Sequence, residues 1–419
     1  MRLLKQIETI CQEAKKASFE LSILSDKIRS ESIVLASENI KKNKNKILSE
    51  NKKDIELALN KKLNSSLIDR LRLDDDRINS MVEGMKSISK LPNPVGKRLE
   101  IWNRPNGLNI EKVTVPIGVI GVIYESRPNV TADAAALCLK SCNATILRGG
   151  SESFNSSNLI VEIIRQSFKE NGLPDGTLQN IPTINRDAVG YLLKMDQYLD
   201  VIVPRGGRSL IERVIKDSRI HVIRHLDGIC HTYIHKSADI KIAADVLVNA
   251  KMRRPGICGA TETLLIDNEI IKTHLSEIIK KLKELKCEVR GDKYIKNFDD
   301  SVILANEKDW KTEYLDTIIS IKTIKYGVDE AIDHINKYGS NHTDCIVSED
   351  KECIELFLNK VDSGIVMHNT STQFADGGEF GMGAEIGIST SKLHARGPVG
   401  VSQLTSFKYK VRGNGQVRP

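Results

Sequence analysis

The chain of 419 residues is predicted to be an α/β protein with two domains and a small β arm. Three observations support this class. Residues 1 to about 95 have helical periodicity, the region after Val113 alternates short apolar runs with helical segments, and the alternation returns after residue 228. Strands that alternate with helices indicate a parallel sheet with helices on its faces. The sequence therefore predicts a doubly wound domain followed by a second α/β domain.

The first predicted elements are amphipathic helices within residues 1 to about 95. Their apolar residues recur at three- and four-residue spacing, which places them on one helical face. The spacing is seen in Ile7, Ile10, Cys11 and Ala14, and again in Ile47, Leu48, Ile55 and Leu57. A proline-rich run over residues 91–96 ends this region.

A β-hairpin is predicted next, over residues 101–110. Asn106-Gly107 stands between two possible strands, and this dipeptide is a strong hairpin signal. A hairpin between two domains can serve as an oligomerisation arm or be a plain surface ribbon.

The two α/β regions follow. In the first, strands are predicted over residues 119–124, 144–148 and 200–203, and helices over residues 131–140, 156–168 and 209–216. In the second, strands are predicted over residues 263–266, 301–304 and 343–347. The glycine-rich segment 374–387 has too many turns for a helix and is predicted to be a functional loop.

Two of the predicted strands run into glycine-rich turns. They read Arg148-Gly149-Gly150-Ser151-Glu152 and Pro204-Arg205-Gly206-Gly207-Arg208-Ser209. Each turn offers backbone N–H groups and an arginine at the start of a helix, where an anion is favoured, and ligands of such sheets bind at the carboxyl ends of the strands. Together they predict a phosphate-bearing cofactor. Neither turn is a G-x-G-x-x-G or Walker A motif, and tight turns alone would also explain the glycines.

Cys258 is the candidate nucleophile. It follows Arg253-Arg254-Pro255-Gly256, where proline and glycine favour a turn, and it precedes an apolar run that begins at Thr263. Positive charge lowers the pKa of a thiol, and the two arginines are candidates to supply it. The alternative is that Cys258 is a small buried hydrophobic residue, as most free cysteines are.

Composition excludes several classes of protein. The eight cysteines form no C-x-x-C pair, no N-terminal stretch resembles a signal peptide, and no apolar run is long enough to span a bilayer. These features predict a reduced, cytoplasmic protein without a membrane partner. The net charge of +7 is spread along the chain, which gives little support to a nucleic-acid partner.

No metal site is predicted, although histidines and a cysteine cluster in residues 221–235. His221 and His225 are interpreted as lying on one β-strand, where residues four apart are separated by about 13 Å. That is too far for both to bind one ion. The other members of the cluster are Cys230, His231 and His235.

The order of these motifs resembles that of the aldehyde dehydrogenase superfamily over nearly the whole chain. Within that superfamily, four longer stretches are most similar to the branch that reduces glutamyl phosphate. The shared motifs are residues 116–121, Pro128, the turn at residues 148–152, the Cys258 loop and Gly381-x-Gly383-x-Glu385-x-Gly387. The four longer stretches are residues 124–131, 227–231, 254–258 and 377–390.

The resemblance implies NADPH-dependent reduction of L-glutamyl 5-phosphate to L-glutamate 5-semialdehyde with release of phosphate, the second step of proline biosynthesis. Cys258 would form a thioacyl intermediate that accepts hydride. The oxyanion would be held by the backbone N–H of Cys258 and by a side chain of Ser126 or Asn129. The enzymatic alternative is a phosphorylating or acylating aldehyde dehydrogenase for a different acyl phosphate or acyl-CoA. The non-enzymatic alternative is a scaffold or nucleic-acid binder.

The resemblance also implies cofactor and substrate contacts. Arg148 and Ser151 match adenine-ribose contacts, and an arginine there favours NADP over NAD. Glu313 matches the contact to the nicotinamide ribose, although the Phe-Gly-Pro that follows it in the superfamily is replaced here by Leu315-Asp316-Thr317. The other implied cofactor residues are Gly149, Gly150, Glu152, Pro204, Arg205, Gly206 and Gly207. Candidates for the substrate's anionic groups are Arg127, Arg205 and Arg254, each of which can instead be a surface ion-pair partner.

The general-base glutamate of hydrolytic members is replaced here. Their Glu-Leu-Gly-Gly reads His225-Leu226-Asp227-Gly228, so water should attack a thioester poorly. The implied domains are an NADP-binding domain (1–98 and 112–227), a catalytic domain (228–390) and an oligomerisation arm (99–111 and 391–419). A homodimer or homotetramer is expected, with a small-molecule acyl phosphate as substrate and a glutamate kinase as a candidate partner.

Overall fold

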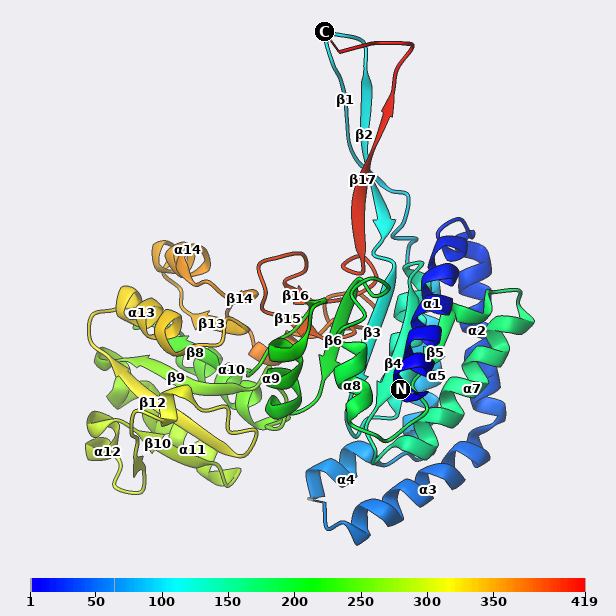
Figure 1. Cartoon of the computed structure of the whole chain (residues 1–419). Helices are drawn as coiled ribbons and strands as arrows, with labels where there is room; N and C mark the ends of the chain where they lie inside the picture. The colour runs from blue at the N-terminus through cyan, green and yellow to red at the C-terminus, as the bar shows by residue number, and fades with distance from the viewer. Residues whose placement is uncertain (1, 64, 419) are drawn as a thin grey trace. The chain divides into compact units, whose positions relative to one another are not determined.

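The computed structural model describes residues 2–63 and 65–418, and the chain forms two compact units (Figure 1). Unit 1 comprises Met1–Arg224, Gly381–Gly387 and Val399–Pro419. Unit 2 comprises His225–Phe380 and Ile388–Pro398. Each unit contains a parallel sheet with helices, so the predicted α/β class is confirmed.

Unit 1 begins with five helices, as the periodicity predicts. They are α1 (Arg2–Leu21), α2 (Asp26–Lys42), α3 (Lys44–Asn60), α4 (Ser65–Leu71) and α5 (Asp75–Lys90). Ser25 and Asp74 cap α2 and α5 by accepting backbone N–H groups of their first turns. In α1 the apolar stripe Ile7, Cys11 and Ala14 is fully buried. Among the described residues, no helix is long and apolar enough to cross a membrane.

The sheet of unit 1 has five parallel strands in the order β5-β4-β3-β6-β7. Its elements are β3 (Val119–Tyr124), α6 (Asn129–Lys140), β4 (Ala144–Gly149), α7 (Phe154–Glu170), β5 (Leu178–Asn180), α8 (Asp187–Leu192), β6 (Val201–Arg205), α9 (Arg208–Asp217) and β7 (His221–Val222). All six residues of β3 are buried, as expected for a central parallel strand. The chain order reverses between β3 and β6, and ligands of doubly wound sheets bind at that point.

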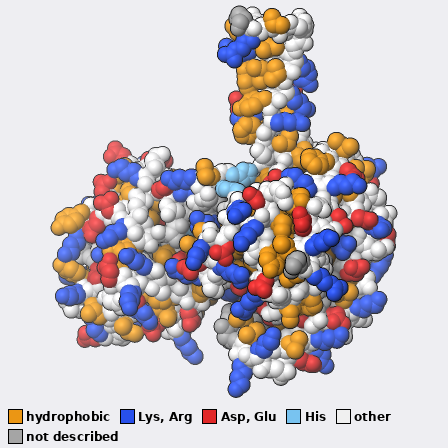
Figure 2. All heavy atoms as spheres, viewed as in Figure 1, with side chains coloured by type: hydrophobic (Ala, Val, Ile, Leu, Met, Phe, Trp, Pro, Cys, Tyr) orange, Lys and Arg blue, Asp and Glu red, His pale blue; other side chains and the backbone are white. Residues whose placement is uncertain are grey.

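The arm of unit 1 is a three-stranded antiparallel sheet in the order β1-β2-β17. Its strands are β1 (Arg98–Asn103), β2 (Asn109–Pro116) and β17 (Thr405–Arg412). The predicted hairpin is therefore present, and Gly107 in its turn has a φ of +89°, which favours glycine. Apolar side chains run along this ribbon (Figure 2).

One face of the arm carries five apolar side chains because the strand register aligns them, and the Glu100–Lys112 ion pair lies on the same face. Trp102 lies opposite Ile110, which lies opposite Val411, and Phe407 and Tyr409 follow at two-residue steps along β17. Phe407, Tyr409 and Val411 are about half exposed. We call Trp102, Ile110, Phe407, Tyr409 and Val411 the arm face.

The sheet of unit 2 has seven parallel strands in the order β11-β10-β12-β9-β8-β13-β14. Its elements are β8 (Cys230–Ile234), α10 (Ile240–Met252), β9 (Thr261–Asp267), α11 (Ser276–Glu284), β10 (Glu288–Gly291), α12 (Lys293–Phe298), β11 (Ile303–Leu304), β12 (Ile318–Ile324), α13 (Val328–Tyr338), β13 (Thr343–Val347), α14 (Lys351–Lys360) and β14 (Ile365–His368). A short antiparallel pair, β15 (Ile388–Ser389) and β16 (Gly397–Pro398), also belongs to the fold. Two apolar clusters form the core, one involving α10 and α11 and the other α13 and α14.

Two predicted strands are shorter than expected. The strand predicted over residues 301–304 is reduced to β11, because Ser301 donates its N–H and its hydroxyl to Asp299 and forms a turn instead. The strand proposed for His221 to His225 is reduced to β7, an edge strand that pairs with β6 through two residues only. The chain leaves the sheet after Val222, and His225 belongs to unit 2.

Candidate active site

Cys258 lies on the loop between the end of α10 at Met252 and the start of β9 at Thr261. Its turn is closed by a hydrogen bond of 3.0 Å from the Ala260 N–H to the Ile257 carbonyl. Six of the eight cysteines are buried, whereas Cys258 and Cys353 are partly exposed. The loop predicted from Pro255 and Gly256 is therefore present, and the alternative of a fully buried Cys258 is wrong.

Gly228 holds this loop by a close backbone contact. A Cβ atom at Gly228 would lie 2.1 Å from the Cys258 carbonyl oxygen and 2.6 Å from its Cα. No residue with a side chain fits there without moving the backbone of Cys258. The thiol of Cys230 donates to the same carbonyl oxygen at 3.1 Å. Gly228, just before β8, and Cys230, its first residue, therefore hold the loop that carries Cys258 in place.

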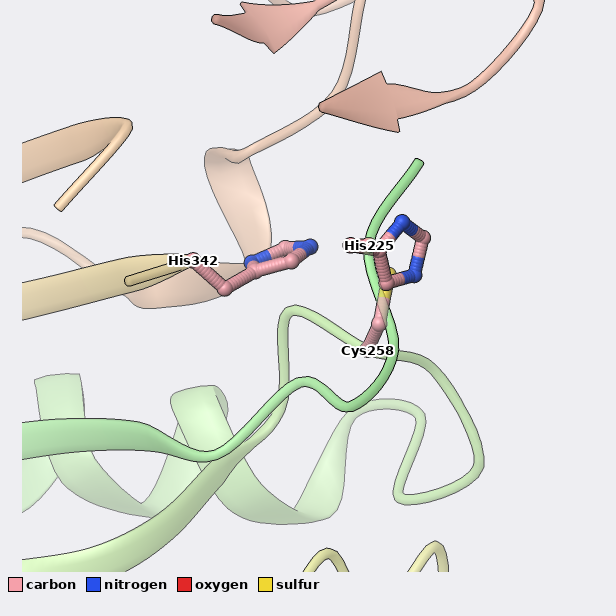
Figure 3. Close-up of side chains that lie close together, drawn as sticks. All are labelled: His225, Cys258 and His342. Atoms are coloured by element: carbon pink, nitrogen blue, oxygen red, sulfur yellow. The ribbon is translucent and has the colours of Figure 1, made fainter. Parts of the chain in front are cut away.

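Two histidines flank the Cys258 sulfur (Figure 3). One ligand atom from each of His225, Cys258 and His342 lies within 4.8 Å of the other two. Burial alone would raise the pKa of the Cys258 thiol, but the interactions with His342 and His225 outweigh it and hold the pKa well below its ordinary value. The lowered pKa favours the thiolate, which is the nucleophilic form of the sulfur.

Each imidazole is anchored through its other nitrogen. His225 Nδ1 contacts the Ile388 carbonyl oxygen at 2.9 Å, and His342 Nδ1 contacts the Thr343 hydroxyl at 2.9 Å. His342 is fully buried, and its Nε2 atom has no hydrogen-bond partner among the described residues. A ring nitrogen of His342 points toward Cys258 and His225 (Figure 3).

The source of the positive charge differs from the sequence-based expectation. Arg253 and Arg254 are exposed, so solvent screens them, and they are not among the main causes of the lowered Cys258 pKa. Sequence reasoning missed His342, which gives no local signal and reaches the site only through the position of β13. For His225 the signal was its place in His225-Leu226-Asp227-Gly228.

Glu313 lies beside the Cys258 loop. Its Oε1 atom accepts the Gly228 N–H at 2.9 Å, and burial is the main cause that raises its pKa. The Oε1 atom of Glu313 therefore helps to hold Gly228 against Cys258. If Glu313 also contacts a cofactor, it would do so through its second carboxylate oxygen, Oε2.

In unit 1 the first glycine-rich turn, between β4 and α7, is filled by Glu152. The Glu152 carboxylate accepts the N–H and the hydroxyl of Ser126 at 3.0 and 2.9 Å and contacts the Ser151 hydroxyl at 3.2 Å. A Cβ atom at Gly150 would lie 2.3 Å from this carboxylate. The helix start that follows is also occupied, because the buried Asp54 accepts the N–H groups of Asn155 and Ser156 at 3.1 and 2.8 Å.

The second glycine-rich turn, between β6 and α9, holds another carboxylate. The Gly207 N–H donates to Glu125 Oε2 at 2.9 Å, and a Cβ atom at Gly206 would lie 2.5 Å from the same oxygen. Each turn thus holds an acidic side chain against its glycines, Glu152 in the first and Glu125 in the second. Hydroxyl groups, such as those of a ribose, can donate to these carboxylates.

Arginines gather near the first turn. Arg148 is nearly buried, with Nη1 donating to the Gly149 carbonyl oxygen at 2.7 Å and Nε without a hydrogen-bond partner among the described residues. Desolvation lowers its pKa, and Arg186 and Arg213 are close enough to lower it further. Glu152 and Glu125 act in the opposite direction, so the surroundings of Arg148 contain charges of both signs. Sequence reasoning missed Arg186 and Arg213, which lie outside the two glycine-rich turns, although Arg213 is on the helix that follows the second turn.

The remaining candidates have these surroundings. Asn129 is the first residue of α6 and donates to Asp133 at 3.3 Å. Arg205 packs against Gly387, where a Cβ atom would lie 3.2 Å from Nη1. Arg127 is half-buried and Arg254 is exposed.

The histidine cluster of residues 221–235 disperses along the fold. Cys230 lies beneath Cys258, and His231 contacts the buried Asp344 carboxylate at 2.9 Å. His235, just beyond β8, contacts the hydroxyls of Ser237 and Ser348 at 2.9 and 3.0 Å.

Comparisons with known proteins agree with this architecture. The model of the aldehyde dehydrogenase family matches residues 4–296. The gamma-glutamyl phosphate reductase of Paramagnetospirillum magneticum is 54% identical over 97% of this chain and 96% of its own length, and that of Rhodospirillum rubrum is 58% identical over 88% and 86%.

Solved structures extend this match. The crystal structure of gamma-glutamyl phosphate reductase from Thermotoga maritima superposes with a TM-score of 0.96 at 40% identity and covers 99% of this chain and 100% of its own. An acetylating aldehyde dehydrogenase from Geobacillus thermoglucosidasius, 16% identical with a TM-score of 0.70, shares the fold. The chain belongs to the aldehyde dehydrogenase family and, within it, to the gamma-glutamyl phosphate reductases.

Proposed function

We propose that this chain reduces L-glutamyl 5-phosphate to L-glutamate 5-semialdehyde, with NADPH as the hydride donor and Cys258 as the nucleophile. Membership of the gamma-glutamyl phosphate reductases supports the reaction and its place in proline biosynthesis. The observation that carries the role of Cys258 is its lowered pKa between two histidines, on a partly exposed loop. The names of the relatives favour glutamyl phosphate over a different acyl phosphate or acyl-CoA.

In the proposed mechanism the Cys258 thiolate attacks the acyl carbon. A carbon–sulfur bond forms, the bond from carbon to the phosphate oxygen breaks, and phosphate leaves with the electron pair. When bound, NADPH would supply the hydride that reduces the resulting thioester. The adduct on Cys258 then expels the thiolate and releases the aldehyde, so Cys258 returns to its starting state.

The two histidines stabilise the thiolate as nucleophile and again as leaving group. His342 is the larger electrostatic contributor to the lowered Cys258 pKa. His225 stands where hydrolytic members carry a general-base glutamate, and its Nδ1 is engaged with the Ile388 carbonyl oxygen. We propose that this replacement protects the thioester from water, because the carboxylate that would activate water is missing.

The backbone N–H of Cys258 is the proposed donor to the oxyanion, with Ser126 and Asn129 as candidates for the side-chain donor. Both side chains donate to carboxylates in unit 1, to Glu152 and to Asp133. To serve the oxyanion, either one has to exchange that partner. Arg127, Arg205 and Arg254 are the proposed contacts for the anionic groups of the substrate.

The nicotinamide cofactor of this family is proposed to be NADPH. Glu125 and Glu152 line the glycine-rich turns and would accept ribose hydroxyls, and Arg148 with Arg186 and Arg213 would meet the 2′-phosphate. Residues 148–152, Pro204–Gly207 and Glu313 are the proposed cofactor contacts. A chain that lacks this arginine cluster would have no electrostatic reason to prefer NADPH to NADH.

We also propose that the arm mediates assembly into a homodimer or homotetramer. The arm face exposes aromatic and aliphatic side chains, and the outer edges of β1 and β17 have free backbone groups. The acyl phosphate substrate is reactive, so a glutamate kinase in the same compartment, the cytoplasm, is the proposed source.

The experiment is the reverse reaction, because the aldehyde is more stable than the acyl phosphate. Purified protein is given glutamate 5-semialdehyde, phosphate and NADP, and NADPH absorbance is followed. We expect reduction of NADP to require phosphate and to be abolished in Cys258→Ser, with NADPH affinity nearly unchanged. Equal rates with propionaldehyde and CoA, or substantial activity in Cys258→Ser, would contradict the proposal.

A further inference from the structure

The amino ends of three adjacent strands of unit 2 bring His225, Cys258 and His342 together. His225 precedes β8, Cys258 precedes β9 and His342 directly precedes β13, and β8 lies between the other two strands in the sheet. The register fixes these ends, since Cys230 pairs with Thr261 and His231 lies opposite Asp344. The three side chains therefore converge because of the sheet itself.

The donor set is one that zinc prefers. Zn²⁺ in proteins binds cysteine sulfur at about 2.3 Å and histidine nitrogen at about 2.0 Å, so tetrahedral ligands stand roughly 3.3–3.8 Å apart. Here the three donor atoms already lie within 4.8 Å of one another. Side-chain rotations that move the donor atoms by about 1 Å would bring them to the spacing of tetrahedral zinc ligands.

The groups around the cluster are arranged as they are around metal-bound histidines. A ligating histidine usually bonds a carbonyl or another polar group through its second nitrogen. His225 does so to the Ile388 carbonyl oxygen and His342 to the Thr343 hydroxyl. The buried Nε2 atom of His342 lacks a hydrogen-bond partner among the described residues and points into the cluster (Figure 3). When this nitrogen carries no proton, it has a lone pair to give to a cation, and binding of the cation then replaces its support of the thiolate.

We propose that His225, Cys258 and His342 form a binding site for a soft divalent cation of the Zn²⁺ class, which masks the nucleophile and reversibly inhibits the enzyme. The sulfur and the two ring nitrogens each donate an electron pair, any proton on these atoms passes to water, and no electron is transferred. Three protein ligands leave a fourth position for water. The inhibition rests on the proposed function, whereas the binding does not.

A second cluster provides the control. His235, Asp350 and Cys353 also place their donor atoms within 4.8 Å of one another. These residues follow the carboxyl ends of β8 and β13, whereas the first cluster lies at the amino ends of the strands. Asp350 is already engaged there, because it caps α14 by accepting the N–H groups of Glu352 and Cys353 at 3.0 and 3.1 Å. Cys353→Ser tests whether bound metal belongs to this cluster instead.

The test uses the whole chain, freed of metal with a chelator. Zn²⁺ is titrated against a chromogenic chelator, and Co²⁺ is added separately to read the thiolate-to-metal charge-transfer band. We expect one equivalent of metal to bind, the band to be lost in Cys258→Ser, and affinity to fall at least tenfold in His225→Gln and in His342→Gln. The Cys353→Ser variant should bind Zn²⁺ with the same affinity as the unchanged protein and keep the Co²⁺ band.

A second measurement needs no variant. The unchanged protein is treated with iodoacetamide with and without Zn²⁺, and the labelled cysteines are mapped by mass spectrometry. Protection of Cys258 that a chelator reverses supports the proposal. Absence of protection, or metal binding that persists in Cys258→Ser but is lost in Cys353→Ser, overturns it. If no metal binds but the phosphate-dependent reduction of NADP is intact, the metal site is refuted and the proposed function is not. If Zn²⁺ binds at Cys258 but that activity is absent, the proposed function is refuted and the metal site is not.

Discussion

At Cys258, burial and the two neighbouring imidazoles act on the thiol in opposite directions. Desolvation disfavours the thiolate, and His342 and His225 favour it by a larger amount. Cys230 contacts the Nδ1 atom of His342 at 3.7 Å and Cys353 lies near His235, yet burial is the main cause that raises the pKa of both thiols. Burial also raises the pKa of Cys138 and of Cys345 to about 12. Reactivity in this chain is therefore concentrated in one thiol.

The first prediction concerns the rate of alkylation at neutral pH. Cys258 should react with iodoacetamide faster than every other cysteine, because its pKa is lowered and those of the other seven are raised. In His342→Gln the pKa should rise, and each unit above 7 reduces the thiolate fraction about tenfold. Peptide mapping over time measures this.

The matched control is His368→Gln, which replaces an exposed histidine at the end of β14 in the same unit. Its alkylation rate should equal that of the unchanged protein. An unchanged rate in His342→Gln would show that this imidazole does not support the thiolate.

At the scale of the elements, the backbone contact between Gly228 and Cys258 sets the position of the loop. Gly228→Ala should destabilise the loop and reduce turnover strongly, because the new Cβ would overlap the Cys258 carbonyl at 2.1 Å. Gly256→Ala in the same loop is the control, since its Cβ would have only an ordinary contact of 3.7 Å. Steady-state kinetics measures the loss of turnover, and a thermal melt measures the loss of stability in each variant. Equal activity in both variants would contradict the role of this contact.

A buried ion pair links α10 to β9 near this loop. Lys251 Nζ lies 2.5 Å from Glu262 Oε2, and both side chains are fully buried. Lys251→Met should lower the free energy of unfolding by about 3–5 kcal/mol, because it leaves a carboxylate buried without its partner. Adding Glu262→Gln should recover much of that loss.

Urea titration monitored by circular dichroism measures the unfolding midpoint. Lys281→Met, which removes the partner of the exposed Asp245, is the control and should change stability by less than about 1 kcal/mol. A Lys251→Met midpoint equal to that of this control would mean that the buried pair contributes nothing.

The sequence predicted the elements well where local pattern decides them. The predicted bounds of β3 and β13 match the structure. In β3 the reason is a continuous apolar run, which specifies a buried parallel strand. It overestimated the strands at residues 221–225 and 301–304, where an edge position and a turn at Asp299 override propensity. For the site, the Cys258 loop was predictable from Pro255 and Gly256. His342 was not, because only the order of the strands brings it to the sulfur.

At the scale of the whole molecule, the arm face exposes a row of aromatic and aliphatic side chains to solvent. Replacing Phe407 and Tyr409 by Asp should reduce the assembly to a monomer of 46.7 kDa, because charge on this face opposes its burial. Replacing Lys408 and Lys410 by Asp, on the opposite face of β17, is the matched control and should preserve the assembly. Light scattering after size-exclusion chromatography reports the mass. A monomeric unchanged protein would refute assembly through the arm.

The order of the units along the chain has a consequence for biogenesis. Unit 2 is inserted within unit 1, whose closing segments, Gly381–Gly387 and Val399–Pro419, are translated after most of unit 2. A ribosome therefore exposes the Cys258 loop and its sheet before β17 exists to complete the arm. If subunits pair through the arm as proposed, nascent chains can pair only after the proposed nucleophile is already in place.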